Sequence, residues 1–490
     1  MRSAALASAT AAAVALCGCA VGPNFQRPSA PATRAYRPAG ESRPVGTAAA
    51  AAQQRAPAAG PYAQRILLGG TAVSDWWTLF HSPELDELMR RALADNRNLV
   101  AAKATLAQAQ ELVAAQTGRF FPQLGLQAGA GRQKYGKEFL GDLIPSVPPF
   151  TYEAFGASVS YTLDYDGAVA RSVEEQKALE QYERSELSAA QLTLTGDVAS
   201  EAVVIAATRG EIRAAAELLS EDRDNLRLVK TAFANGSVSK LDVLTAQSQL
   251  ASDQALPPPL YQQLAMARHA LAVLLGQPPA EWAQPDLELT DLRLPRQLPV
   301  SVPSQLVRRR PDILAAEAQL HAATAAVGVA TANLYPQIAL TATLGQQALT
   351  PANLFNASST AWSLIAGLTQ PLFDGGTLRA ERRATLDALH ASAARYQQVV
   401  LDSFGQVADL LDALDHDAQL VAAQANARDT SEASLELARE SYRAGNSGVL
   451  QVIDAQRERQ RAELGFLEAQ SRQYLDTVQL LLAVGGSPLI

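Results

Sequence analysis

Two very long stretches without proline constrain the fold of this chain more than any other feature. Residues 167–231 and 377–443 contain no proline, so each can form one uninterrupted helix. At about 1.5 Å per residue, such a helix extends roughly 100 Å, which is longer than a globular domain of this size can hold. The sequence therefore predicts two long helical rods.

Both stretches place mostly apolar residues at alternating steps of three and four, the pattern of coiled-coil packing. Three acidic residues, Glu201, Asp222 and Asp417, interrupt these seams, so we expect packing weaker than that of a leucine zipper. The seam positions are Val198, Ile205, Thr208, Ile212, Ala215, Leu219, Leu226, Val229 and Phe233 in the first stretch, and Leu386, Leu389, Ala393, Tyr396, Val400, Ser403, Val407, Leu410, Leu414 and Val421 in the second.

The two rods belong to two copies of one unit. Three landmarks recur in the same order about 210 residues apart, far beyond the period of a solenoid repeat. The first landmark pairs Phe121 to Leu124 with Tyr335 to Ile338. The second pairs Asp166-Gly167 and Arg171 with Asp374-Gly375 and Arg379, and the third pairs Phe233 to Gly236 with Tyr442 to Gly445.

Each copy reads as helix, two strands, long helix, turn and return helix. The first helix is predicted from Ser82-Pro83 to about Thr117, because serine can cap it and proline suits its first position. Its counterpart starts near Pro303 and Pro311. The first repeat is expected over 74–300, with strands in 122–166, a long helix over 167–231 and a return helix over 239–275 that breaks at Pro257 to Pro259. The second repeat is expected over 301–490, with strands in 336–373, a long helix over 377–443 and a return helix over 448–484.

The strand regions alternate apolar with small or polar residues over about ten positions, as in a membrane barrel with a wet lumen. One face of the first expected strand carries Leu124, Leu126, Ala128 and Ala130, and one face of the last expected strand carries Trp362, Leu364, Ala366 and Leu368. The alternative is a soluble amphipathic sheet packed on the helices. Four strands cannot close a barrel, so spanning a membrane requires either two chains with eight strands or three chains with twelve.

The N-terminus reads as a secretion signal followed by an acylation site. Residues 1–18 combine Arg2 with an apolar run, and Leu16 to Cys19 resembles a bacterial lipobox with Cys19 as the lipidated residue. The alternative is an ordinary leader with two incidental cysteines. Ala20 and Val21 lack the acidic residue of an inner-membrane retention signal, which favours the outer membrane. Residues 19–73 then read as an acylated, extended tether.

Charge and composition exclude several functions. The 41 basic and 49 acidic residues give a net charge of −8, which argues against a nucleic-acid partner. The five histidines show neither metal-ligand nor triad spacing, so we expect no enzyme and no cofactor. Asp415-His416-Asp417 is the one tight cluster, and we expect it to be a solvated helix face. After the leader, no run of about 18 uninterrupted apolar residues predicts a transmembrane helix.

With these features in order, the chain resembles the outer membrane factor (TolC-like) family, in particular the lipoprotein branch of multidrug efflux channels. The resemblance rests on the lipobox, Gly22 to Pro28, Trp76 to Phe80, Tyr335 to Gln337, Phe373 to Gly376 and Tyr442 to Gln456. It implies a mainly α fold with a membrane β-barrel. Three protomers would form a twelve-stranded barrel and a helical tunnel in the outer membrane and periplasm, docked to an adaptor protein and an inner-membrane RND-type pump.

The resemblance also assigns roles to the two helical hairpin tips, whose turns contain Gly236 and Gly445. In the family, acidic rings line the aperture there. Aligning the turns pairs Asp242 with Gln451 and Thr245 with Asp454, so Asp242 and Asp454 are the candidate ring residues. For Asp242 the alternative is helix capping, because Ser239 lies three positions before it.

The second tip departs from the family pattern. Ser447 stands where TolC carries an arginine that helps hold the closed state, and Gln451 stands at the position of a ring aspartate. A closed state of this chain would therefore depend on other contacts, with Tyr442 and packing as candidates.

Two alternative functions stay open at this stage. The first alternative to an efflux channel is the outer component of a type I protein secretion system. The second is a lipid-anchored periplasmic coiled-coil scaffold. The lipid anchor favours efflux over secretion, and the duplicated strands disfavour the scaffold. The sequence specifies neither the substrate nor the pump.

Overall fold

The computed structural model describes residues 20–33, 35–37, 62–70, 74–135, 148–282 and 286–485. The predicted signal peptide, Cys19 and most of the predicted tether lie outside the described residues. The chain divides into two compact units, each built from separate stretches of sequence. The first unit contains the residues up to Arg27, Leu106–Glu183 and Ala316–Tyr396, and the second contains Pro28–Thr105, Arg184–Ala315 and Gln397–Ile490.

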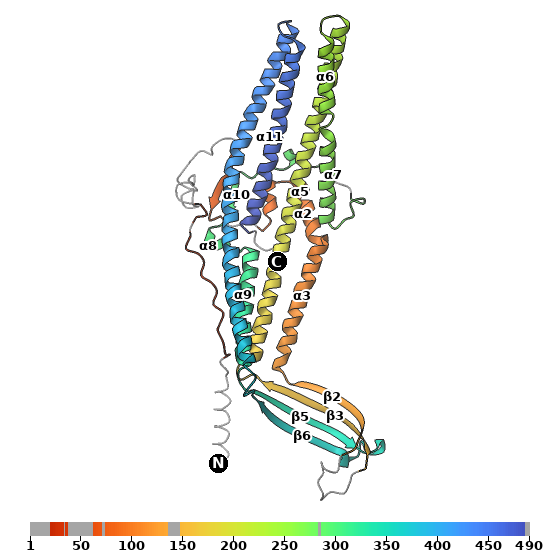
Figure 1. Cartoon of the computed structure of the whole chain (residues 1–490), viewed down its shortest axis with the longest axis vertical. Helices are drawn as coiled ribbons and strands as arrows, with labels where there is room; N and C mark the ends of the chain where they lie inside the picture. Colours follow the sequence, from red (N-terminus) through yellow and green to blue (C-terminus); the bar gives the residue numbers. More distant parts are fainter. Residues whose placement is uncertain are drawn as a thin grey trace. The chain divides into compact units, whose positions relative to one another are not determined.

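The first unit contains one antiparallel sheet of four strands in the order β2-β3-β5-β6 (Figure 1). The strands are β2 (Gln123–Gln133), β3 (Phe150–Leu163), β5 (Gln337–Ala348) and β6 (Thr360–Thr369). The two hairpins of the repeat therefore lie side by side, joined by the pairing of β3 with β5. Neither β2 nor β6 has a second strand partner within the described residues, so both edges of the sheet are open.

The register gives the sheet one apolar face. Leu126 lies opposite Ala157, Ala157 opposite Leu344, and Leu344 opposite Trp362, so one row of apolar side chains crosses all four strands. Trp362 is 76% exposed, and no described helix covers it. The alternative of a soluble sheet packed on the helices is therefore wrong.

The other face is lined by small and polar side chains. In one row Gly125 lies opposite Ser158, Ser158 opposite Thr343, and Thr343 opposite Ser363. The hydroxyls of Thr343 and Ser363 lie 2.7 Å apart and form a hydrogen bond. The sheet thus has the two unlike faces that the alternation in the sequence predicts.

The helices either lie within the second unit or have residues in both units. Those of the second unit alone are α2 (Pro83–Asp95), α6 (Lys240–Asp253), α7 (Pro257–Leu274), α8 (Pro303–Leu306) and α11 (Val449–Ala483). Those with residues in both units are α3 (Arg97–Thr117), α5 (Ala168–Ala234), α9 (Pro311–Ala332) and α10 (Thr377–Arg443). Helices α5 and α10 each have 67 residues, which corresponds to roughly 100 Å.

Most of the predicted seam positions in the long helices are buried. Val198, Ile205 and Val229 of α5 are almost fully buried, as are Val407 and Val421 of α10. Phe233 is an exception, because it lies in the last turn of α5 and is exposed, so its assignment to the seam is wrong. The coiled-coil pattern is therefore real but ends before the tip.

Within the part of the chain that the structure describes, one helix passes the length and hydropathy criteria for a membrane span. Helix α9 contains an 18-residue window with a mean hydropathy of 1.3, and 56% of that window is buried inside the chain itself. A core helix has the same properties, so this window is weak evidence for a membrane span.

The described parts of the predicted tether are bound to the rest of the chain. In the second unit β1 (Arg65–Leu68) pairs in parallel with β4 (Gln297–Val300). Arg37 forms ion pairs at 2.9 Å with both Asp412 and Asp415 of α10. These described residues of the predicted tether are thus held by partners far away in the sequence.

The predicted break in the first return helix is present at Pro257. A second break, in the first helix of the repeat, was not predicted. Helix α2 ends at Asp95 and α3 begins at Arg97, so the expected continuous helix to Thr117 is wrong. Asn96 explains the break, because its side-chain oxygen accepts a hydrogen bond from the Leu99 backbone N–H at 3.0 Å and its amide donates to the Leu274 carbonyl at 2.9 Å. The side chain both caps α3 and fixes it to α7.

We predict that Asn96→Ala lowers the free energy of unfolding by about 1–3 kcal/mol, because it removes a helix cap and a buried hydrogen bond together. Asn98→Ala is the matched control, since Asn98 is exposed two residues later. Thermal unfolding of both variants in the same detergent would measure the difference. Equal midpoints for the two variants would contradict this role of Asn96.

Candidate functional site

The two helical hairpin tips have the same backbone geometry. Gly236 and Gly445 have φ angles of +75° and +76°, in the left-handed region that favours glycine. At the first tip, the N–H groups of Gly236 and Ser237 donate to the carbonyls of Phe233 and Ala232, both at 2.9 Å. At the second tip, Gly445 and Asn446 repeat the arrangement at 3.0 Å. These bonds satisfy the last free carbonyls of α5 and α10.

The two return helices start differently. At the start of α6, Ser239 and Asp242 form a capping box, in which the Ser239 backbone N–H donates to the Asp242 carboxylate at 2.7 Å. Hydrogen bonds from Ser239 lower the pKa of Asp242. Helix α11 begins after Gly448, which offers no side-chain cap. The capping alternative for Asp242 is therefore present in the structure, and the carboxylate is ionised at neutral pH.

The remaining predicted aperture residues lie on the second tip. Asp454 is exposed on α11 with Arg457 one turn away at 3.9 Å, and Gln451 is exposed a turn earlier. Tyr442 is partly exposed near the end of α10. The Ser447 hydroxyl is buried and has no hydrogen-bond partner within the described residues. One tip thus presents a carboxylate that caps its own helix, and the other presents an exposed carboxylate that is paired with Arg457.

A polar network that the sequence analysis missed joins the two hairpins below the tips. The carboxylate of Glu221 on α5 accepts hydrogen bonds from Arg439 of α10 at 3.1 Å, and from Gln456 and Arg459 of α11 at 3.1 and 3.4 Å. Gln456 also bonds Asn225 of α5 in a buried contact. Gln456 ends the segment Tyr442 to Gln456 that carries the family resemblance, but its partners on α5 could not be predicted from the sequence.

An apolar cluster lies beside this network. Its members come from both hairpins and are buried, with Leu226 and Val238 packed against them. They are Val229, Val243, Ala246, Val449 and Ile453. The two hairpins of one chain are thus joined by an apolar core and by a charged network with partly exposed members.

Comparison with known proteins assigns the chain to a family. Residues 88–277 and 302–486, one segment from each repeat, match the family described as outer membrane efflux protein. This chain belongs to that family. It is 32% identical to the pyoverdine export outer membrane protein OpmQ of Pseudomonas aeruginosa over 87% of this chain and 91% of the relative. It is 30% identical to the toluene efflux pump outer membrane protein TtgF of Pseudomonas putida, over 97% and 95%.

The fold is that of the solved efflux channels. The outer-membrane channel OprN superposes with a TM-score of 0.84 at 28% identity, over 96% of this chain and 99% of the other. VceC of Vibrio cholerae superposes with a TM-score of 0.78 at 23% identity, over 85% and 99%, which shows a shared fold. The chain is therefore an outer membrane efflux channel with the TolC-like fold. The described residues hold no group of three or more His, Cys, Asp and Glu that could bind a metal ion.

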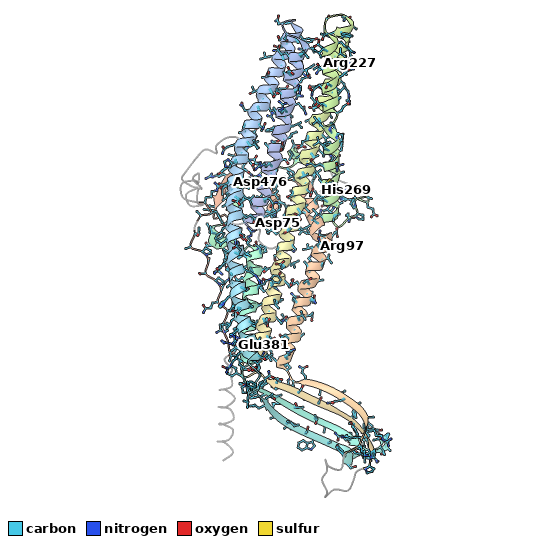
Figure 2. The ribbon with its side chains drawn as sticks, in the orientation of Figure 1. Asp75, Arg97, Arg227, His269, Glu381 and Asp476 are labelled. Atoms are coloured by element: carbon cyan, nitrogen blue, oxygen red, sulfur yellow. The ribbon has the colours of Figure 1, made fainter. Side chains whose placement is uncertain are left out.

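Two pairs of aspartates, all buried except the half-buried Asp476, interrupt the helical packing of this channel. Asp222 of α5 faces Asp253 at the end of α6, and Asp417 of α10 faces Asp476 of α11, which Figure 2 labels. Asp417 is 2% exposed, so the expected solvated face at 415–417 is wrong at this position. Asp415 instead pairs with Arg37.

Burial makes one carboxyl of each pair hard to ionise. Desolvation, together with the neighbouring Asp253 and Glu221, raises the pKa of Asp222 to about 7 against the opposing charge of Arg457. Desolvation and Asp476 likewise raise the pKa of Asp417 to about 7, although Arg472 lies 3.2 Å away. One proton shared within each pair allows its two carboxyl groups to form a hydrogen bond.

We predict that Asp222→Asn and Asp417→Asn each stabilise the channel at pH 8. A raised carboxyl pKa means that the folded state binds protons more tightly, so wild-type stability falls as the pH rises from about 4 to about 7. The amide imitates the protonated form, so each variant is expected to unfold at least about 2 °C higher at pH 8. Near pH 4 the difference is expected to disappear.

The measurement is thermal unfolding in detergent at pH 4, 6 and 8. Asp409→Asn is the matched control, because Asp409 is exposed on α10. A pH-independent difference, or destabilisation at pH 8, would show that neither pair shares a proton.

Proposed function

We propose that three copies of this chain form a passive export duct from the periplasm across the outer membrane, docked to a periplasmic adaptor and an inner-membrane RND-type pump. The observation that carries the proposal is the open four-stranded sheet with a bare apolar face. A lipid bilayer would cover that face, while further strands would pair the two edges.

The number of strands favours three copies. Two copies would supply eight strands, whose interior is just wide enough for side chains to fill. Three copies supply twelve and leave room for a lumen. The face with Gly125, Ser158 and Thr343 would line that lumen, because small and polar side chains tolerate water.

The cargo in this proposal is a small molecule. The relatives are named for export of pyoverdine and efflux of toluene, so the family serves compounds of differing polarity. A passive duct sets no strict requirement on its cargo, and the pump supplies the energy. The lipid anchor at Cys19 would hold each protomer at the outer membrane and favours efflux over type I secretion.

The hairpin tips would form the periplasmic aperture in this proposal. Asp454 would stand three times around the opening, and Asp242 would add charge where its capping role leaves an oxygen free. Such a ring focuses negative potential and favours cations. The Glu221 network, rather than Ser447, Gln451 or Tyr442, would hold the hairpins of one protomer together.

We predict that Asp454→Asn lowers the cation selectivity of reconstituted channels, because it removes up to three charges from the aperture without removing a helix cap. Reversal potentials measured across a KCl gradient would move towards zero, and Asp242→Asn/Asp454→Asn would move them further. Asp224→Asn is the control, since Asp224 is exposed on α5 and pairs with Arg227. Unchanged reversal potentials in the double variant would remove both residues from the aperture.

The barrel itself is tested by two neighbouring residues of β6. Leu364 is 74% exposed on the apolar face, whereas Ser363 lies on the polar face. An arginine that faces the lipid costs about 2–4 kcal/mol per site near the middle of the membrane, and one that faces the lumen costs far less. We predict that Leu364→Arg abolishes assembly and that Ser363→Arg permits it.

The measurement is the yield of folded oligomer in the outer-membrane fraction, with negative-stain images of the purified particles. Three-fold particles for wild type and Ser363→Arg, and none for Leu364→Arg, are expected. Soluble, detergent-independent wild-type particles would instead support the periplasmic scaffold.

A further inference from the structure

The residues that follow Cys19 lie in a defined place in the first unit. Residues 20–27, called here the anchor segment, pass the turn that connects β3 with α5. The Val21 N–H donates to the Asp166 carbonyl at 3.0 Å. A Cβ atom at Gly167 would meet the Cα of Ala20 at 2.6 Å, so Ala20 lies directly against this turn. The segment thus begins at the end of a strand.

Arg171 binds the anchor segment from the first turns of α5. Its guanidinium is buried, with 4% of the side chain exposed. Nε donates to the Val21 carbonyl at 3.1 Å, and Nη2 donates to the Asn24 side-chain oxygen at 2.6 Å and to the Ala20 carbonyl at 3.4 Å. Three of its acceptors therefore belong to one short segment of chain.

The remaining nitrogen of Arg171 connects this contact to α9. Nη1 pairs with Glu174 at 2.7 Å, and Glu174 in turn bonds His321 of α9 at 3.0 Å. Burial opposes ionisation of Glu174, but hydrogen bonds from His321 and Arg171 outweigh it and lower the pKa of the carboxyl. The His321 ring stacks on Phe25 with centroids 4.2 Å apart. Arg27 completes the contact through Glu317 at 2.7 Å.

Two glycines make room for the segment. A Cβ at Gly22 would lie 2.6 Å from the Cα of Gly328, and the φ of +90° at Gly22 favours glycine. A Cβ at Gly328 would lie 2.7 Å from the Cγ of Arg171. The segment, α9 and the arginine are therefore in close contact at one point.

The second repeat provides an internal comparison. Its matching residues, Asp374 and Arg379, are exposed, and Asp374 caps α10 by accepting from Gly376 and Leu378 at 2.8 Å. In the first repeat the main cap of α5 comes from Asp164, which accepts from Val169 and Ala170 at 2.7 and 2.9 Å. The strand-to-helix turn alone does not require a buried arginine, so the burial of Arg171 is specific to the copy that meets the anchor segment.

We propose that Arg171, Glu174, His321 and Gly328 form a socket that fixes the anchor segment, so that the lipid on Cys19 is held where the strands end rather than on a mobile tether. Arg171 acts as the positioning residue. This inference rests on the proposed acylation of Cys19, which is bonded directly to Ala20. Release of the segment would leave a buried guanidinium without three of its acceptors, which is unfavourable.

The test is hydrogen–deuterium exchange, read by mass spectrometry on the full-length acylated protein from outer membranes. Arg171→Ala is expected to speed exchange in residues 21–27 at least tenfold, while exchange at the hairpin tips stays unchanged. Asn24→Ala removes an acceptor from the segment itself and is expected to act in the same direction. Arg379→Ala, the matched position in the second repeat, is expected to leave the segment protected.

Further variants separate the socket from general stability. Arg171→Lys keeps the charge but loses the forked donor, so it is expected to restore protection only in part. Cys19→Ser, expressed without the lipid, is expected to keep the segment protected, because the protein contacts alone hold it. Wild-type exchange in Arg171→Ala and Asn24→Ala, or loss of protection in Cys19→Ser, would overturn the socket.

Failure of the acylation proposal gives a different result. The intact mass of the wild-type protein shows directly whether Cys19 carries lipid, whatever the exchange data show. An unmodified Cys19 with a protected segment would refute the lipid-positioning role but keep the contacts. A lipidated Cys19 with an unprotected segment would refute the socket and keep the anchor.

Discussion

The unpaired backbone N–H and C=O groups at the two open edges of the sheet require hydrogen-bond partners from outside this chain's own sheet. Strands β2 and β6 have 11 and 10 residues, and no partner within the described residues binds their outer edges. In a bilayer, each unpaired N–H or C=O costs several kcal/mol, and water is not there to replace the bond. A single copy is therefore unstable in the membrane, while its apolar face, with Leu364 and Trp362 bare, is unfavourable in water. Oligomerisation would satisfy both requirements, which is why the proposed duct needs further copies of the chain.

The helical part has a different balance of forces. Its seams bury Val198, Val407 and Val421, but they also bury Asp222 and Asp417, which a packing optimised for stability would exclude. Near the tips an apolar cluster and the Glu221 network join the same two hairpins. The apolar cluster is insensitive to salt, whereas the network depends on charges that are partly exposed and can exchange partners with water. A link of this kind holds the hairpins in place without locking them.

Features that depend on local chemistry could be predicted from the sequence, and features that depend on distant partners could not. The bounds of α10 coincide with the proline-free stretch, and the break at Pro257 follows from the proline ring. The break at Asn96 was missed because asparagine is tolerated inside helices, and the residue that fixes it, Leu274, is 178 positions away. Asp417 was expected both to interrupt the seam and to lie on a solvated face; its burial agrees with the first expectation, but its partner Asp476 lies on another helix and could not be predicted. At the tips, the glycine turns and the Ser239 cap were readable, whereas the Glu221 network, with members on α5, α10 and α11, was not.

The duplication shows how one local structure acquires a second role. Both copies turn from strand to helix through an Asp-Gly pair followed by an arginine, and an aspartate caps the helix in each. In the second copy the landmark residue Asp374 is that cap. In the first copy Asp164 provides the main cap, while the Asp166 backbone carbonyl accepts from Val21 and Arg171 binds the anchor segment. The difference in burial between Arg171 and Arg379 is then a consequence of chain order, because only the first copy follows a segment that can bind it. A repeat that is symmetric in sequence thus becomes asymmetric in structure where the N-terminus meets it.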